Sequence, residues 1–508
     1  MKIKRDHSND KTMESTKHSR SELPRLCLVD TALLLCITVV LPVLLATTKI
    51  VPTLYLVALL VAGLALTGAV YFLTRAPKSP KRRMVGTVLT VVLLIIAIMG
   101  SYFIVRTVNT IQRVANAATE KSTISFYALQ DSAAETLDDM AGDTFGILST
   151  LDRANTNAAL QQVKEEQGLD LTTAEYDGLR ALADALLDGS VDGIILNEAY
   201  LPIYEETNGY EEFPSQLKLI SNHQVEHTIE AGPVNDDHII NVLISGSDTR
   251  NSVLDQRGRS DVNIIASINT ETHQILLLST PRDYFVPLDV GEPDADDKLT
   301  HAGIYGMDVL MGTLSNLYGI DLDYYFRVNF TGFVNIIDAL GGVDVYSDYD
   351  FSAGGYDYRQ GMNTLDGEAA LAFARERHSF AQGDRQRGEN QMAVIEAVLK
   401  KAVSPSILTS YLSILNSVQD CIDTSVPYEV MAELVRQQLE SGGSWNVESY
   451  SVDGSDGRST TYSMNQELYV MIPDESTVQQ ARKKLAALSN PVEGLENESS
   501  ATESNPAA

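Results

Sequence analysis

Three apolar segments lie within the first 105 residues and constrain the N-terminal part of the fold more than any other feature. They cover about residues 31–48, 54–73 and 84–105. Each approaches the roughly 20 residues that a helix needs to cross a bilayer. Charged residues are almost absent from them, which disfavours core helices of a soluble protein. We therefore expect three transmembrane helices in residues 31–105, without a cleavable signal peptide, because no small-residue cleavage pattern follows the first segment.

The charge distribution predicts the orientation of these helices. Residues 1–105 hold 13 Lys/Arg and 5 Asp/Glu, a net charge of +8, whereas the remainder carries −38. Basic residues gather in the tail 1–30 and in the connection 75–83, while the other connection has only Lys49. Positive loops stay in the cytoplasm, so we predict a multi-pass cell-membrane protein with a cytoplasmic N-terminus and an extracellular region after about residue 106. Its acidic balance argues against nucleic acid as a partner.

The extracellular region alternates strand-like and helix-like segments, which predicts an α/β fold class. Residues 106–235 are expected to form a small accessory α/β domain, with a helix at 174–187 among its elements. Residues 236–402 are expected to form the catalytic domain, a mixed central sheet covered by helices, one of them at 303–318. Two further segments complete the division: a C-terminal extension packing on the catalytic domain at 403–488, and a disordered polar tail at 489–508.

Two aspartates lie at predicted strand ends. Asp248 follows one strand in "SGSDTR", and Asp261 precedes the next in "GRSD". Carboxylates at strand ends can hold a hard cation, and Mg²⁺ (or Mn²⁺) favours one or two carboxylates with waters and phosphate oxygens. An ordinary turn role remains the alternative for either residue, since Asp is common in turns.

Arginines cluster near these aspartates in a chain that is otherwise acidic. The cluster comprises Arg259, Arg282, Arg375, Arg377, Arg385 and Arg387. The planar guanidinium suits bidentate capture of phosphate, although salt bridges to the abundant acidic residues are an open alternative. Arg375 and Arg377 cannot share one face of a regular helix. Both can reach one pocket only if a helix ends there.

Seven motifs occur in order between residues 238 and 402. They are "NVLISGSDTR", "GRSDVNIIASIN", "ILLLSTPRDYFV", "KLTHAGIYG", "VNFTGFVNIIDALGGVDV", "LDGEAALAFARER" and "GDRQRGENQMAVIEAV". Together they resemble the LytR-CpsA-Psr family of envelope glycopolymer transferases. The resemblance covers about a third of the chain, and a membrane anchor before an external catalytic domain fits the family.

The resemblance implies ligands and residue roles. The ligands are a polyprenyl-pyrophosphate-linked glycan, peptidoglycan and a divalent cation. The residues expected to bind the cation are Asp248 and Asp261. Those expected to take part in catalysis are Arg282, Arg375, Arg377 and Asp384, and those expected to bind the substrate are Arg259, Arg387 and Gln391. An apolar groove for the lipid tail has as candidates Ile304, Leu310, Leu314, Phe326, Phe330, Phe333 and Ile337, for each of which plain core packing is the alternative.

The predicted location and the resemblance together favour one reaction. Nucleoside triphosphates are scarce outside the cell, so the activated bond must come with the substrate. We expect transfer of a glycopolymer, such as teichoic acid or capsule, to a peptidoglycan hydroxyl, with a phosphodiester formed and polyprenyl phosphate released. Asp384 or Asp283 is the candidate general base. Hydrolysis of the lipid carrier and a non-catalytic regulator or scaffold are the alternatives.

Overall fold

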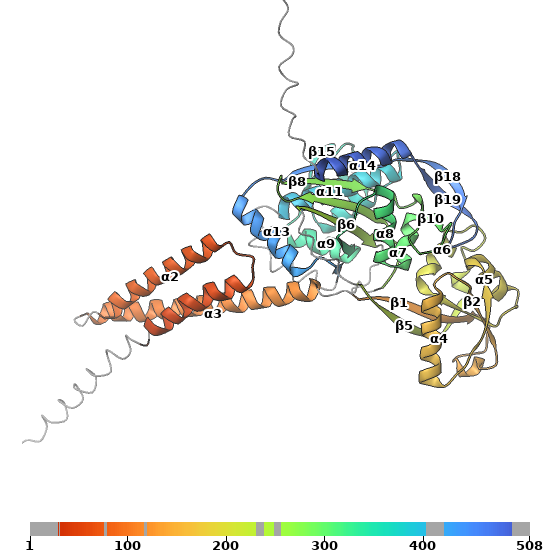
Figure 1. Ribbon diagram of the computed structural model, residues 1–508, viewed down its shortest axis with the longest axis horizontal. Helices are drawn as coiled ribbons and strands as arrows, with labels where there is room; N and C mark the ends of the chain where they lie inside the picture. Colours follow the sequence, from red (N-terminus) through yellow and green to blue (C-terminus); the bar gives the residue numbers. More distant parts are fainter. Residues whose placement is uncertain are drawn as a thin grey trace, which may run out of the picture. The chain divides into compact units, whose positions relative to one another are not determined.

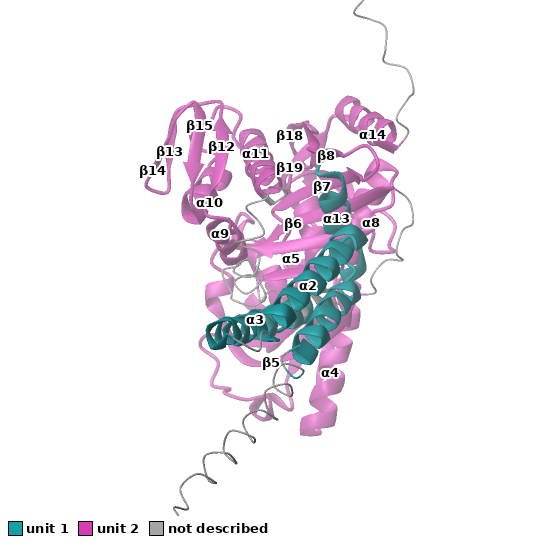
Figure 2. Cartoon of the chain, turned by 90° about the vertical axis from the view of Figure 1, so that its left-hand side faces the viewer, with its two compact units in different colours: residues 1–112, 428–442 teal, residues 113–427, 443–508 magenta. Residues whose placement is uncertain are grey.

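The computed structural model describes residues 29, 31–75, 79–115, 119–229, 238–247, 256–402 and 421–489 (Figure 1). They divide into two compact units, residues 1–112 with 428–442, and residues 113–427 with 443–508 (Figure 2). The sequence predictions for the tail 1–28, for Asp248 and for the tail 490–508 lie outside the described residues.

The first unit contains the apolar helices. Helices α2 (Thr53–Thr74) and α3 (Pro80–Ala115) are both long and apolar enough to cross a membrane. The helix Thr31–Thr47 is apolar but shorter, so the third crossing stays a prediction. The helix Thr31–Thr47 packs closely on α2 at Gly63. A Cβ atom at position 63 would lie only 2.7 Å from Thr38 Cγ2, so the close contact requires glycine. Small residues allow such close approach between apolar helices.

Helix α13 (Tyr428–Ser441) belongs to the same unit as the apolar helices. The Tyr428 hydroxyl donates to the Thr48 carbonyl at 2.7 Å, and the Tyr55 hydroxyl donates to the Leu439 carbonyl at 3.4 Å. The predicted C-terminal extension is therefore divided: this helix joins the N-terminal unit, while the strands and the helix after it join the second unit.

Residues 119–228 of the second unit build a five-stranded sheet in the order β3-β2-β4-β1-β5, called here the accessory sheet. Its strands are β1 (Thr119–Leu129), β2 (Thr144–Leu148), β3 (Thr172–Tyr176), β4 (Gly193–Asn197) and β5 (Leu217–Thr228). Helix α4 (Arg153–Gln167) contributes Val163 to the core on one face, and α5 (Gly178–Leu187) contributes Leu182 to the core on the other. Strand β4 is buried along its whole length, as expected for a strand covered on both faces.

The sheet of the predicted catalytic domain, called here the catalytic sheet, has six strands in the order β16-β11-β6-β7-β8-β17. They are β6 (Ile239–Ser247), β7 (Val262–Asn269), β8 (Gln274–Ser279), β11 (Tyr324–Asn329), β16 (Ile422–Thr424) and β17 (Asn446–Ser451). Pairing is antiparallel within β6-β7-β8 and parallel at β11-β6 and β17-β8. The predicted mixed sheet is confirmed.

Helices cover both faces of the catalytic sheet. Ile265 and Leu276 pack with α7 (Leu299–Tyr305), α8 (Met307–Tyr318) and α14 (Glu475–Ser489). The alternate residues Ile264 and Leu277 pack with Met392 of α11 (Asp384–Ala402). Successive side chains of a strand point to opposite faces, and here both faces are buried. This explains the nearly continuous apolar runs of β7 and β8.

Short elements complete the second unit. Two-stranded sheets are formed by β9 (Phe285–Pro287) with β10 (Asp296–Lys298), β12 (Val343–Ser347) with β15 (Gly361–Leu365), β13 (Phe351–Ala353) with β14 (Tyr356–Tyr358), and β18 (Gly454–Thr460) with β19 (Glu467–Pro473). The remaining helices are α6 (Leu201–Glu205), α9 (Phe330–Ala339) and α10 (Gly367–Arg375), with three-residue 3₁₀ turns at Asp138–Met140, Glu198–Tyr200 and Pro214–Gln216.

Glycines break two predicted helices. The prediction of a helix over 174–187 is wrong at its start, because β3 extends to Tyr176 and α5 begins only at Gly178, whose φ is +85°. The single helix predicted over 303–318 is two helices, separated at Gly306 with φ +131°. Such positive φ values favour glycine and stop a helix.

Candidate anion-binding site

A cavity of about 340 Å³ opens on the face of the catalytic sheet that α11 covers, and we call it the arginine pocket. Its lining residues come from β6, the start of β7 and the residue before it, the loops after β8 and α10, and helices α9, α10 and α11: Gly246, Asp261, Val262, Arg282, Phe330, Arg375, Arg377, His378, Arg387 and Gln391. Residues that are far apart in the sequence meet here because strand ends and helix ends converge on one edge of the sheet. The pocket brings together six of the nine predicted site residues.

The end of α10 explains how Arg375 and Arg377 reach the same pocket. Helix α10 ends at Arg375, and Glu376 is extended, with φ −68° and ψ 132°. Arg377 therefore lies in the following loop, so the helical spacing rule no longer separates the two side chains. The Arg375 guanidinium carbon lies 4.3 Å from the Phe330 ring centroid, a cation–π contact. Both arginines are exposed, and within the described part of the chain neither pairs with a carboxylate.

Asp261 and Arg282 form the opposite wall. Asp261 is placed by its backbone N–H, which donates to the Gly246 carbonyl at 2.8 Å before β7 begins. Arg282 follows β8, and its Nη1 lies 2.8 Å from Asp261 Oδ1. Thr300 Oγ1 donates to the same oxygen at 3.2 Å. The carboxylate thus fixes one edge of the guanidinium beside the pocket.

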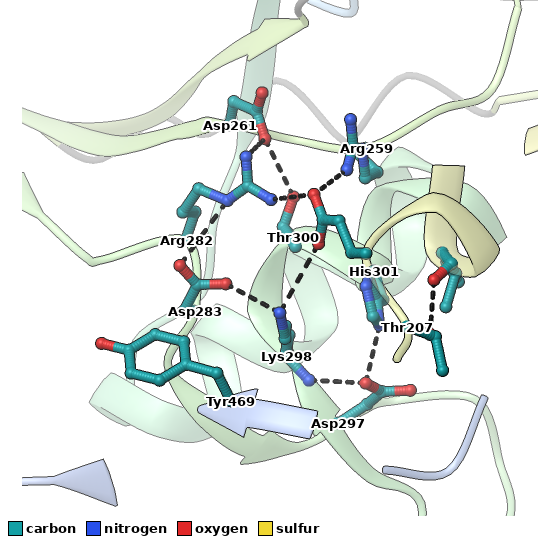
Figure 3. A network of polar contacts seen from close by, with 12 residues as sticks. Thr207, Arg259, Asp261, Arg282, Asp283, Asp297, Lys298, Thr300, His301 and Tyr469 are labelled. Carbon is teal, nitrogen blue, oxygen red and sulfur yellow. Dashed lines mark hydrogen bonds and ion pairs between the residues drawn. The ribbon is translucent and has the colours of Figure 1, made fainter. Parts of the chain in front are cut away.

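A second carboxylate, that of Glu206, binds the far edge of Arg282. Glu206 follows α6 of the accessory region directly, lies 3.2 Å from Arg282 Nη2 and also pairs with Arg259 Nη1. Lys298 Nζ lies 3.6 Å from Glu206 and 3.2 Å from Asp283, and Figure 3 shows the second of these contacts. The charges of Arg259, Arg282 and Lys298 outweigh the effect of burial and lower the pKa of Glu206 to about 2.

Below this network Asp297 and His301 form a buried pair. His301 Nδ1 lies 2.7 Å from Asp297 Oδ1, and the Lys298 and Ser463 backbone N–H groups donate to the same carboxylate. Burial would raise the pKa of Asp297, but His301 and the donated hydrogen bonds lower it below its usual value. The pair anchors the start of α7 behind the pocket.

The residues present partly meet the needs of a hard cation. Asp261 Oδ1 is engaged by Arg282 and Thr300, whereas Oδ2 has no partner among the described residues. No group of three or more His, Cys, Asp or Glu residues in the described ranges is arranged as a metal site. One carboxylate oxygen beside phosphate oxygens and waters is nevertheless a donor set that Mg²⁺ accepts.

Some of the predicted site residues do not line the arginine pocket, or lie outside the described residues. Arg259 lies behind Arg282, paired with Glu206, rather than in the pocket lining. Asp384 begins α11, but its side chain is outside the described residues, as is Asp248. Arg385 pairs with Asp453, away from the pocket. Sequence reasoning missed Glu206, Lys298 and His378, because none has a distinguishing spacing in the chain.

For most of the lipid-groove candidates the structure favours the alternative, plain core packing. Ile304, Leu310, Leu314 and Ile337 are at most 1% exposed and belong to packed cores. Leu310 and Leu314 lie on α8, whose sheet face is opposite to that of the arginine pocket. Only Phe330 lines the pocket, whereas Phe326 and Phe333 are partly buried beside other clusters.

The fold and the site define an α/β protein with apolar N-terminal helices and a pocket lined by four arginines. Residues 205–487, more than half of the chain, match the LytR_cpsA_psr family. The chain belongs to this family, which confirms the resemblance carried by the seven motifs. A second match, to a DNA polymerase processivity factor over residues 80–196, covers less than a quarter of the chain.

Curated relatives share a name. One from Halalkalibacterium halodurans, "Polyisoprenyl-teichoic acid--peptidoglycan teichoic acid transferase TagU", is 34% identical over 236 residues, which are 46% of this chain and 74% of that protein. Its namesake from Enterococcus faecalis is 34% identical over 202 residues, 40% of this chain and 66% of the relative.

Solved structures are similar over about half of the chain. TagV of B. subtilis is 27% identical with a TM-score of 0.43, covering 50% of this chain and 98% of that one. TagT bound to LIIa-WTA is 25% identical with a TM-score of 0.41, covering 52% and 97%. At these TM-scores we draw nothing further from the likeness.

Proposed function

We propose that this protein transfers a glycopolymer from a polyprenyl-pyrophosphate carrier to a sugar hydroxyl of peptidoglycan. The observation that carries the proposal is the pair Arg375 and Arg377, two exposed pocket cations without a carboxylate partner among the described residues. In a chain of net charge −30 such a pair of guanidinium groups is suited to an anionic ligand. Membership of the family and the names of the TagU relatives support a lipid-linked glycan as that ligand.

In the proposed reaction the acceptor hydroxyl oxygen attacks the phosphorus atom that carries the glycan. The bond from that phosphorus to the bridging oxygen breaks, and polyprenyl phosphate leaves with the bridging oxygen. A phosphodiester joins glycan and acceptor, and the hydroxyl proton passes to a base, for which Asp384 and Asp283 are the candidates. Arg375, Arg377 and Arg387 would bind the non-bridging oxygens and stabilise the charge that develops on the leaving phosphate.

Arg282 has a different part in this proposal, because Asp261 holds one edge of its guanidinium. It would present a fixed set of donors to the pyrophosphate rather than a mobile charge. Asp261 Oδ2, together with Asp248, would hold Mg²⁺ or Mn²⁺. The ion would supply charge neutralisation of the phosphate oxygens.

The location completes the proposal. The apolar helices α2 and α3 would anchor the chain in the cell membrane, with the shorter helix Thr31–Thr47 as a third crossing and the N-terminus in the cytoplasm. The pocket then lies outside the cell, where a lipid-linked pyrophosphate brings its own activated bond and no nucleotide is required.

The test uses the purified full-length chain in detergent with Mg²⁺, a synthetic polyprenyl-pyrophosphate glycan and an uncrosslinked peptidoglycan oligomer. Mass spectrometry of the products should give a glycan–peptidoglycan conjugate that contains one phosphate. Free phosphoglycan without conjugate would instead indicate a hydrolase. Intact donor that binds but never reacts would indicate a regulator or scaffold.

A further inference from the structure

Glu206 connects the accessory region to the arginine pocket. It follows α6, and its backbone is fixed on both sides, since Tyr204 and Thr207 are fully buried. The Thr207 hydroxyl donates to the Ile203 carbonyl at 2.6 Å, and the Tyr204 hydroxyl donates to the Leu179 carbonyl at 2.6 Å. The Glu206 carboxylate is therefore presented to the catalytic region from a rigid support.

The contacts of Glu206 are unlike an ordinary surface ion pair. Its carboxylate meets three cations at once, Arg259, Arg282 and Lys298. The side chains of these cations are only 12%, 12% and 6% exposed, and that of Glu206 is 35% exposed. Because the three cations are shielded from solvent, their pairs with Glu206 are screened less than pairs in which both partners are exposed. A shared carboxylate also restrains all three cations together.

The charges of this network cancel among the residues that the structure describes. Its three cations face three described carboxylates, those of Asp261 and Asp283, both labelled in Figure 3, and that of Glu206. The wall that carries Arg282 therefore attracts an anion only weakly, although it contains three basic residues. The net attraction of the pocket comes instead from the opposite wall, with Arg375 and Arg377. Without the carboxylate of Glu206, the Arg282 wall would gain one positive charge.

We infer that Glu206 is a positioning residue of the accessory region, which orients Arg282 and Arg259 and weakens ground-state binding of pyrophosphate by cancelling their charge. This inference rests on the proposed function. As a consequence, the attraction of the free anion depends mainly on Arg375 and Arg377, which also act in the transition state, whereas the restrained Arg282 contributes only once the substrate is correctly placed. Interactions that strengthen only in the transition state raise the turnover rate, whereas uniformly tighter binding does not.

The test compares Glu206→Gln with Glu205→Gln in the full-length chain in detergent. Both substitutions remove one negative charge, but Glu205 is exposed and makes no contact with the arginines. Calorimetry with inorganic pyrophosphate, without a divalent cation, should give a Kd about tenfold lower for Glu206→Gln, because one nearby like charge is lost. Glu205→Gln should match the wild type.

Kinetics separate positioning from charge. With the lipid-linked donor, Glu206→Gln should lower both KM and kcat, a combination that simple misfolding does not produce. Glu206→Asp keeps the charge but is one methylene shorter, so it should lower kcat while the pyrophosphate Kd stays close to that of the wild type. This second variant still gives a result if Glu206→Gln does not fold.

Two results have distinct meanings. Equal pyrophosphate affinity in the wild type, Glu206→Gln and Glu205→Gln, with unchanged kcat, would overturn the inference and leave the proposed function intact. The predicted affinity difference together with a complete absence of conjugate would overturn the proposed function, while the electrostatic role of Glu206 would stand.

Discussion

Substituting Arg375 by alanine separates pocket chemistry from folding more cleanly than other changes in the site. Arg375 is exposed, lies at the end of α10 and pairs with no carboxylate in the described part of the chain. Its contact with the Phe330 ring, at 4.3 Å, is the interaction that the substitution removes. An exposed cation–π contact contributes about 0.5–1 kcal/mol, so the folded population should hardly change.

The expected effect on transfer is much larger. A donor aimed at charge that develops in the transition state is typically worth about 2.7–4 kcal/mol, which corresponds to roughly 100- to 1,000-fold in rate. Arg375→Ala should therefore lose about 100-fold or more in kcat/KM with a nearly unchanged melting temperature. Arg375→Lys keeps the positive charge but loses the planar, bidentate guanidinium, so its activity should lie between that of the wild type and that of Arg375→Ala.

Arg385→Ala is the matched control. Arg385 is also exposed and lies in the same arginine-rich stretch, but it pairs with Asp453 and does not line the pocket. The assay is initial rate of conjugate formation with the lipid-linked donor, beside a thermal melt of each variant. Equal activity of Arg375→Ala and Arg385→Ala would refute the assignment of Arg375 to the pyrophosphate.

Three further predictions concern stability, metal and pH. Arg327, 3% exposed, lies 2.9 Å from Glu120 and 3.0 Å from Asp423. Glu120 would keep its pair with Arg257, but Arg327→Ala would leave the buried carboxylate of Asp423 without a cation and should destabilise the fold by about 3–5 kcal/mol; a melt close to that of the wild type would contradict this. Asp261→Asn should weaken the dependence of transfer on Mg²⁺, measured by titration after EDTA treatment, and an unchanged titration curve would exclude Asp261 as a ligand. The pKa of Glu206 falls from 4.5 to about 2 on folding, so its carboxylate stabilises the folded state. The difference in free energy of unfolding between the wild type and Glu206→Gln should be largest above about pH 4.5 and disappear as the pH falls towards 2. A difference that instead grows in acid would contradict this prediction.

The catalytic sheet was predictable because its strands are buried on both faces. The segments "VNIIASIN" and "QILLLS" are apolar runs of strand length, and they form β7 and β8 over their whole length. Helix breaks were harder to predict, since a positive φ at Gly306 is a property of the packed chain. Apolar residues of α8 were assigned to a groove because the sequence does not say which face of the sheet a helix covers.

The arginines of the pocket were predictable only as a set. Charge composition singled them out, and the family resemblance gave them roles, but the end of α10 at Arg375 explains how two of them reach one cavity. Glu206 was not predictable, since it lies in a stretch of scattered acidic residues and its partners are more than 50 residues away in the chain. Only the packing of α6 beside Arg282 distinguishes it.

The most direct measurement is a crystal structure of the protein with a polyprenyl-pyrophosphate analogue and Mg²⁺. The account predicts that the pyrophosphate lies in the arginine pocket, within hydrogen-bond distance of Arg375 and Arg377, with the metal against Asp261 Oδ2. A pyrophosphate bound elsewhere on the chain, with Arg375 and Arg377 still facing solvent, would contradict it.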